Sequence, residues 1–304
     1  MIQTDSRLIT LNSNDGISLN GDYKSNILFD MGNITGEDED IQYIECCLED
    51  LQLPVSWYLI NDTNNILHYI YNSTNFTITL TKGNYNGTTL INECKKLFLE
   101  NNLTADIVLN QISGLLTFKF ENVISNIIFN YNLSKNLMDL LGFTGSTNGV
   151  AFTCEKPMNL LGVMKINICS NSLSNTGSFS SNKLLNNNII NTINVNVPSY
   201  HQINYVNKVS HYQRLKSKIL NSIDIQLLSD SNLFIEMNDI NWSLTLHLKI
   251  YRKYSTDLKK LNLNFEKEKN EEKNEKEDKE DKDEEINDLD ILTQPKNQPK
   301  KKSN

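Results

Sequence analysis

The stretch that decides the fold is NWSLTLHLKI, residues 241–250, in which apolar and polar side chains alternate strictly. This period of two is typical of a β-strand with one buried face and one solvated face. Burying its large apolar side chains would contribute on the order of 10 kcal/mol before conformational entropy is subtracted. We therefore expect a central strand whose inward face carries Trp242, Leu244, Leu246, Leu248 and Ile250, and whose outward face carries Ser243, Thr245, His247, Lys249 and Tyr251.

The same period recurs along most of the chain, in stretches separated by turn residues. It is found in RLITLN, NILFDM, FTITLT, ADIVLN, LLTFKF, VMKINIC, NIINTINVNVP and SIDIQLL. Roughly ten strands without a regular β-α-β alternation favour an all-β fold. We predict a mainly antiparallel β-sandwich, jelly-roll-like, with one or two short helices.

Two stretches follow the period of a helix instead. Near residues 88–102, apolar side chains recur at helical spacing, with Thr88 or Thr89 as the N-cap. The second stretch is SKNLMDLLGF, for which we expect Ser134 as the N-cap and Gly142 just past the last turn.

A hairpin of two antiparallel strands is predicted from two apolar stretches that flank a turn. The stretches are SWYLI and ILHYIY, and the turn is at residues 61–65. Its aromatic residues are Trp57, Tyr58, Tyr69 and Tyr71. They fit either a core or a platform on which sugars or bases stack. Aromatic alternation in a hairpin is more often core, so we expect this one to be packed against.

Composition divides the chain into three parts. Residues 1–40 are poor in large apolar side chains and predict an extended N-terminal arm. Residues 41–255 predict the sandwich, with the helix near 88–102 inserted and a mobile loop at 170–188. Residues 256–304 predict a disordered charged tail, because apolar side chains are scarce from Glu266 onward, and the tail also offers a short apolar run that a partner could bind.

The net charge of −8 arises in the tail. Residues 266–290 hold fourteen acidic side chains and six lysines, so the remainder of the chain is electrically balanced. Nucleic-acid binding by the globular part is therefore not expected, because it needs clustered cations. We also expect neither a signal peptide nor a membrane span, since no long uninterrupted apolar stretch occurs.

No motif for catalysis stands out in the sequence. The histidines, His68, His201, His211 and His247, follow no metalloprotease or Cys/His spacing, and His247 lies on the polar face of its strand. The pair Glu49–Asp50 resembles surface charge more than the acid pair of a glycosidase. We predict no catalytic residues, no cofactor and no metal site, and hence no enzyme.

The cysteines give no sign of a metal site or of a disulfide framework. They are five in number and lack the CxxC spacing of zinc sites. Buried reduced thiols are the expectation for Cys46, Cys47, Cys94, Cys154 and Cys169.

The order LPVSWYLINDTNN, TITLTKGNYN, LLGF and SIDIQLLSDSNLFIEMNDINWSLTLHLKIYRKY resembles minor capsid proteins, including penton proteins, of virophages and of related Polinton-like and nucleocytoplasmic large DNA viruses. The resemblance covers about residues 41–254, whereas the acidic tail departs from it. It implies a jelly roll in the virion, assembled in the host cytoplasm. It further implies a homo-oligomer, a pentamer being one candidate, that contacts the major capsid protein.

A second interpretation remains open from the residues themselves. In it the chain is a viral fibre-like attachment module or glycan-binding β-sandwich, using the loop at 170–188 or the aromatic hairpin to recognise a receptor.

We expect deletion of residues 256–304 to leave the melting of the fold cooperative, because that segment cannot offset its own ordering entropy. Circular dichroism of the full and truncated chains during heating tests this expectation. Loss of cooperative melting in the truncated chain would refute the boundary.

Overall fold

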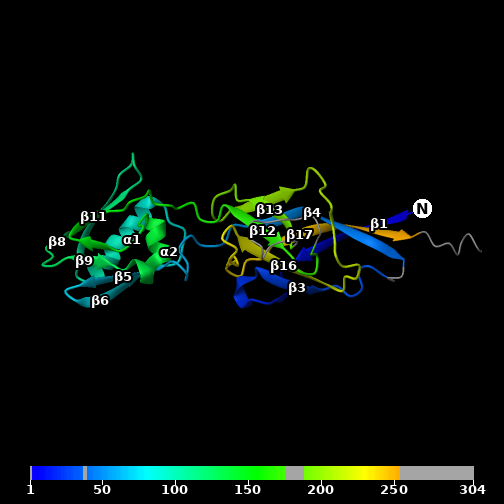
Figure 1. Cartoon of the computed structure of the whole chain (residues 1–304), viewed down its shortest axis with the longest axis horizontal. Helices are drawn as coiled ribbons and strands as arrows, with labels where there is room; N and C mark the ends of the chain where they lie inside the picture. Colours follow the sequence, from blue (N-terminus) through cyan, green and yellow to red (C-terminus); the bar gives the residue numbers. More distant parts are fainter. Residues whose placement is uncertain (1, 37–39, 175–187, 254–304) are drawn as a thin grey trace, which may run out of the picture. The chain divides into compact units, whose positions relative to one another are not determined.

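The computed structural model describes residues 2–36, 40–174 and 188–253 (Figure 1). Most of the regular structure is antiparallel β-sheet, as the sequence predicts, with two α-helices. Of the loop predicted at 170–188, residues 175–187 lie outside the described part, as does the whole tail predicted at 256–304. The elements described below belong essentially to the compact unit Thr4–Tyr251.

The first sheet contains the central strand predicted from residues 241–250. Its strands lie in the order β1 (Ile2–Asn12), β17 (Ser243–Lys253), β4 (Ile41–Pro54) and β14 (Gln202–Val206), and the short β15 (Gln213–Arg214) also pairs with β4. Along β17 every second side chain from Leu244 to Ile250 is fully buried, as expected.

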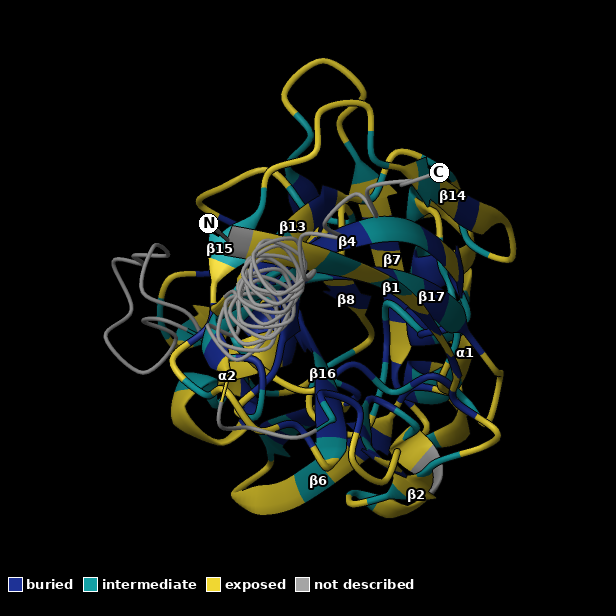
Figure 2. Cartoon of the chain, turned by 90° about the vertical axis from the view of Figure 1, so that its right-hand side faces the viewer, coloured by how far each residue is buried: buried dark blue, intermediate teal, exposed yellow. Residues whose placement is uncertain are grey.

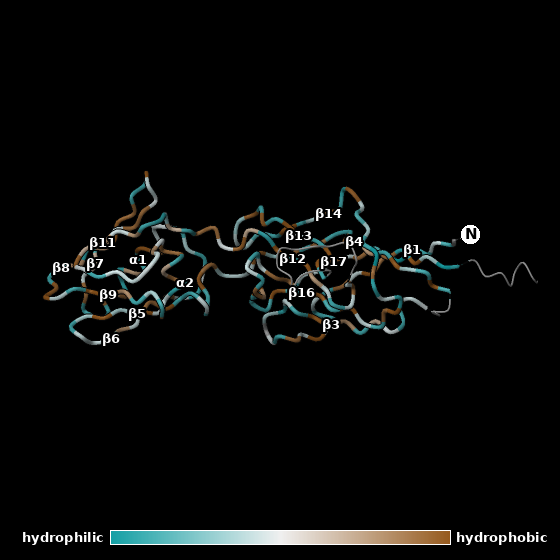
Figure 3. Tube along the Cα trace, in the orientation of Figure 1, coloured by the Kyte–Doolittle hydropathy of each residue, from teal (hydrophilic) through white to brown (hydrophobic). Residues whose placement is uncertain are grey.

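The second sheet has the order β13 (Ile189–Asn194), β12 (Lys165–Cys169), β16 (Ser222–Ser229), β3 (Asn26–Asp30) and β2 (Ile17–Ser18). Each pair of neighbouring strands in this sheet is antiparallel. Period-two burial recurs in β3, where Ile27 and Phe29 are buried, and the hydropathy of the residues along the chain can be followed in Figure 3.

Chain order and sheet order together define a jelly roll. Its eight long strands run β1, β3, β4, β12, β13, β14, β16, β17 along the chain. The first, eighth, third and sixth of them form one sheet, and the fifth, fourth, seventh and second form the other. This interleaving of early and late strands is the jelly-roll arrangement. Figure 2 shows the buried residues on the strands and mostly exposed residues in the connections.

The structure differs from the arm expected for residues 1–40, because β1 and β3 are strands of the two sheets. The buried apolar side chains of these strands are spaced two apart, Ile9 and Leu11 on β1 and Ile27 and Phe29 on β3, and Leu11 is 2 % exposed and Phe29 3 %. Leu8, on the other face of β1, is 66 % exposed. Trp242, the residue before β17, connects this segment to the first sheet. Its indole N–H donates to the carbonyl of Lys24 at 2.7 Å, and its ring contacts Phe29 edge to face. Spacing at period two therefore outweighs low apolar content.

Residues 41–255 also differ from the single sandwich expected, because residues 58–162 carry a second, separate hydrophobic core. We call this segment the inserted domain. It lies in the chain between β4 and β12. Its strands are β5 (Ile66–Tyr71), β6 (Thr74–Thr79), β7 (Thr104–Leu109), β8 (Leu116–Glu121), β9 (Ile127–Phe129), β10 (Thr147–Gly149) and β11 (Ala151–Thr153), and its helices are α1 (Gly87–Glu100) and α2 (Tyr131–Leu141).

Both helices occur where the sequence predicts them, but their N-caps differ. Asn86 caps α1 and shares a capping box with Thr89, and Asn130 caps α2, while Ser134 lies inside it. Gly142 ends α2 with φ of 96°, a left-handed conformation that glycine adopts at little cost. Among the described residues, no helix is both long and apolar enough for a membrane crossing.

The predicted hairpin at residues 56–71 is wrong in its pairing. β5 pairs with β6, which follows it through a two-residue turn, and on its other side with β9. Asn72 and Ser73 form that turn with φ of 49° and 59°. Positive φ at both central residues matches the right-handed twist of a hairpin, and asparagine tolerates it well.

We expect Leu246→Asp to abolish soluble expression, because it places a charge at a position with 0 % exposure. Thr245→Asp is the matched control, since Thr245 is the neighbouring residue on the outer face of β17. Equal soluble yields of the two variants would contradict the assignment of the inner face.

Candidate functional site

Two aromatic residues of the predicted hairpin, Trp57 and Tyr69, belong to the cores, Tyr71 packs against the second core, and Tyr58 is partly exposed. Trp57 is 7 % exposed and Tyr69 only 1 %. The Tyr69 ring stacks on Phe76 at 5.3 Å and meets Phe98 edge to face. Because Trp57 and Tyr69 are covered, these two rings offer no platform for sugars or bases.

The four histidines do not form a common site. His68 bonds Thr77 on the paired strand, and His201 and His211 are exposed. His247 is the exception, because it lies in a cluster with other groups able to bind a metal.

That cluster consists of Cys47, Glu49 and His247, and we call it the outer-face cluster. One possible ligand atom of each residue lies within 4.8 Å of the other two, a coincidence found nowhere else in the described residues. His247 Nδ1 is 4.0 Å from Glu49 Oε2 and 2.7 Å from the hydroxyl of Tyr212. Cys47 is buried, whereas Glu49 and His247 are partly exposed.

Strand geometry explains how the outer-face cluster forms. Cys47 and Glu49 are two residues apart on β4 and therefore project to the same side. His247 projects from β17, the neighbouring strand. The connection between β14 and β15 also lies beside the cluster. At its start the backbone N–H of Asn207 donates to the carbonyl of Glu49 at 2.8 Å, and at its end Tyr212 contacts His247.

Burial governs the ionisation of this cluster. It raises the pKa of the Cys47 thiol, an effect that a hydrogen bond with Tyr212 only partly offsets. Burial, together with the neighbouring Cys47 and Glu49, raises the pKa of Tyr212 to about 12. The Lys249 ammonium lies 3.7 Å from the centre of the Tyr212 ring. Thiol and phenol are thus protonated at neutral pH when nothing else is bound.

Sequence reasoning did not bring these residues together. A thiol and a carboxylate two apart on a strand and a histidine on the polar face of another strand are each common. The only usable signal is that Glu49 and Cys47 share the outward side of β4, which says nothing about the neighbouring strand.

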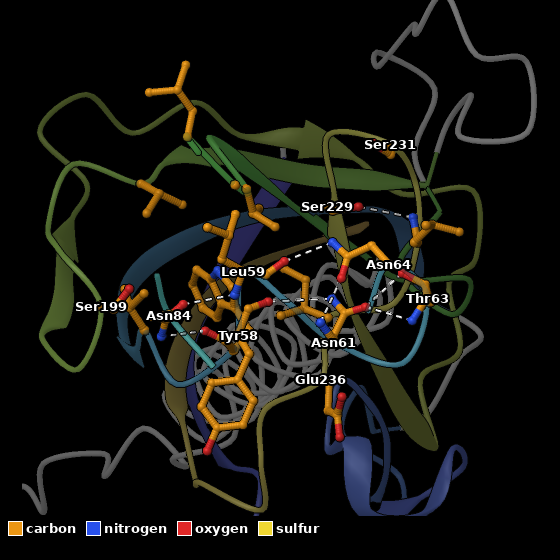
Figure 4. A pocket seen from close by; sticks show the side chains of 18 of the residues that line it. Tyr58, Leu59, Asn61, Thr63, Asn64, Asn84, Ser199, Ser229, Ser231 and Glu236 are labelled. Atoms are coloured by element: carbon orange, nitrogen blue, oxygen red, sulfur yellow. Dashed lines mark hydrogen bonds between the residues drawn. The ribbon is translucent and has the colours of Figure 1, made fainter. Parts of the chain in front are cut away.

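A cavity of about 790 Å³ is lined in part by residues 57–64, and Figure 4 shows it. The asparagines in this lining already have partners. Asn84 Oδ1 accepts from the Leu59 N–H at 2.8 Å, Asn64 Oδ1 accepts from the Asn61 N–H at 2.7 Å, and the Asn64 amide donates to the Leu59 carbonyl at 2.9 Å. These side-chain amides stabilise the conformation of the loop through hydrogen bonds to its backbone, so they are not free to bind a ligand.

A buried carboxylate holds the start of the loop predicted at 170–188. Asp224 on β16 is 7 % exposed and accepts hydrogen bonds from the backbone N–H groups of Asn171 and Ser172 and from the Ser170 hydroxyl. Burial raises the pKa of Asp224, but these hydrogen bonds outweigh it, and its pKa lies below the ordinary value. The ionised carboxylate therefore fixes residues 170–172 against the second sheet.

Comparison with known proteins finds similarity to this chain among solved structures. No protein-family model matches the chain, and no curated protein matches it. Among solved structures the chain is similar to selenomethionine-labelled mavirus penton protein, known from a crystal structure, with 10 % sequence identity and a TM-score of 0.44. The match covers 82 % of this chain and 99 % of the mavirus chain.

We expect Asp224→Asn to lower the free energy of unfolding at pH 7 by about 1–3 kcal/mol, because an amide cannot accept the same set of hydrogen bonds. A depressed carboxyl pKa stabilises the fold above the unfolded-state pKa, and this contribution is lost as the pH falls through the folded-state pKa. The two proteins should therefore converge in stability in acid. Denaturant unfolding from pH 7 downward measures this, with exposed Asp230→Asn as control, and a gap independent of pH would contradict it.

Proposed function

We propose that this chain is a structural component of an icosahedral viral capsid, a minor capsid or penton protein. In this role it self-associates, contacts the major capsid protein and resides in the virion after assembly in the host cytoplasm. The observation that carries the proposal is the interleaved eight-strand order of the two sheets, which is the jelly roll of viral capsid domains.

The same roll also occurs in lectins and cupins, so its interior matters. Here the interior is filled by apolar side chains, among them Ile44, Ile225 and Leu246, each with 0 % exposure. Catalysis needs convergent titratable groups in a cavity. A roll filled in this way suits a rigid building block better than an enzyme.

The edge of the first sheet supports self-association with a second copy of this chain. β14 is the last strand in that sheet's order and pairs with β4. Val206, the last residue of β14, is 65 % exposed, and Tyr200 and Val209, which flank the strand in the chain, are 72 % and 79 % exposed. An edge strand presents unpaired backbone groups, and exposed apolar side chains beside it add area that a partner would bury.

We expect the full chain to form a closed oligomer and to be present in purified particles. Light scattering across a concentration series measures the first property, and mass spectrometry of particles measures the second. The double variant Val206→Lys with Val209→Lys should weaken self-association about 10-fold or more, because it places two like charges on each contacting copy.

Ile112→Lys is the matched control, since Ile112 is 99 % exposed but lies in the inserted domain. Absence of the chain from particles would end the proposal. Monomeric behaviour together with specific binding to one sugar on a glycan array would favour an attachment module.

A further inference from the structure

The outer-face cluster has the chemistry of a zinc site. It offers one sulfur, one imidazole nitrogen and one carboxylate oxygen, from Cys47, His247 and Glu49. Zinc binds these three donor types in proteins, whereas calcium and magnesium prefer sites made of oxygen alone. The mixed donor set therefore selects against the hard cations.

His247 is already oriented for this role. Its Nε2 lies 2.6 Å from the Ser6 hydroxyl on β1, and its Nδ1 faces Glu49. In the tautomer in which Nε2–H donates to Ser6 Oγ, Nδ1 carries the lone pair that a metal needs. An outer hydrogen-bond partner of this kind is typical of histidines that bind metals.

The distances fit a small closure onto an ion. Tetrahedral zinc with bonds of roughly 2.0–2.3 Å holds its ligand atoms roughly 3.3–3.8 Å apart. The ligand atoms here lie within 4.8 Å of one another, and the Nδ1–Oε2 pair is at 4.0 Å. The Glu49 side chain is 38 % exposed, so it can shift by the remaining distance at small cost.

We propose that Cys47, Glu49 and His247 bind one Zn²⁺ ion on the outer face of the first sheet, with water as the fourth ligand. Cys47 binds as the thiolate, and its proton passes to solvent. In the structure the Tyr212 hydroxyl is hydrogen-bonded to Nδ1. When the ion takes that position, this hydroxyl is free to hydrogen-bond the water ligand. The ion would link β4 to β17 and, through Tyr212, to the connection between β14 and β15. This proposal departs from the absence of a metal site expected from the sequence, and it does not depend on the capsid role.

The test uses the full chain, freed of metal with a chelator and kept reduced. Co²⁺ is the spectroscopic probe, and Zn²⁺ competing with a coloured chelator gives the affinity. We expect one equivalent of Co²⁺ to produce a thiolate-to-cobalt charge-transfer band, and one equivalent of Zn²⁺ to remove it.

Cys47→Ser should abolish the band, and His247→Asn should lower zinc affinity by more than about 100-fold. Ser6→Ala should lower it by about 10-fold, as for loss of an outer hydrogen bond to a ligand. The matched controls are Cys46→Ala, the adjacent buried cysteine outside the cluster, and exposed His201→Asn.

Both controls should keep the band and the wild-type affinity. Circular dichroism establishes whether each variant is folded. If Cys47→Ser does not fold, the test rests on His247→Asn, whose side chain is partly exposed in the wild type. Absence of the band in the wild-type chain, or equal zinc affinity in the wild type and His247→Asn, would overturn the proposal. Weak binding that all variants share would be assigned to the acidic tail and would overturn it as well.

Discussion

The face-to-face burial of apolar side chains between two sheets is the constraint on which the roll depends. From Leu244 to Ile250, every second side chain of β17 is 0 % exposed. In the other sheet, β16 contributes Ile223, Ile225 and Leu227 to the same core, also with 0 % exposure. A slip of one residue in either strand would turn this whole set toward water. The apolar period therefore fixes the register, and the register fixes which residues meet on the outer faces.

Those outer faces are free of the packing constraint and carry polar and aromatic contacts instead. On the first sheet, Tyr43 stacks on Tyr251 at 4.3 Å, and the Tyr251 hydroxyl donates to Glu45 at 2.9 Å. The Arg214 guanidinium lies 4.4 Å from the centre of the Tyr43 ring. The outer-face cluster lies on the same side of β4 and β17. Polar, aromatic and ionisable side chains thus interact on the outer face of the first sheet, while the interior of the roll holds apolar side chains.

The inserted domain shows how a roll can carry an addition without losing its own core. Residues 58–162 enter after β4 and return before β12, and they bury their apolar side chains among themselves. Aromatic rings dominate that core, with Phe129 and Phe152 at 4.9 Å and Phe98 and Phe120 at 5.2 Å. The entropic cost of closing a loop rises only slowly with its length, so a long insertion with a core of its own is tolerated.

The sequence by itself determined the local structure and the class of fold. Period-two patterns identified β17, β16 and β12, and helical periodicity identified α1, because these signals come from neighbouring residues. Only the tertiary structure decided the pairing of β5 with β6, the inclusion of β1 and β3 in the sheets, and the second core. It also brought Cys47 and Glu49 beside His247, from opposite ends of the chain. Period reveals which face of a strand is buried, but which strands become neighbours depends on the competition among all their apolar faces, and that competition is settled only when the whole chain packs.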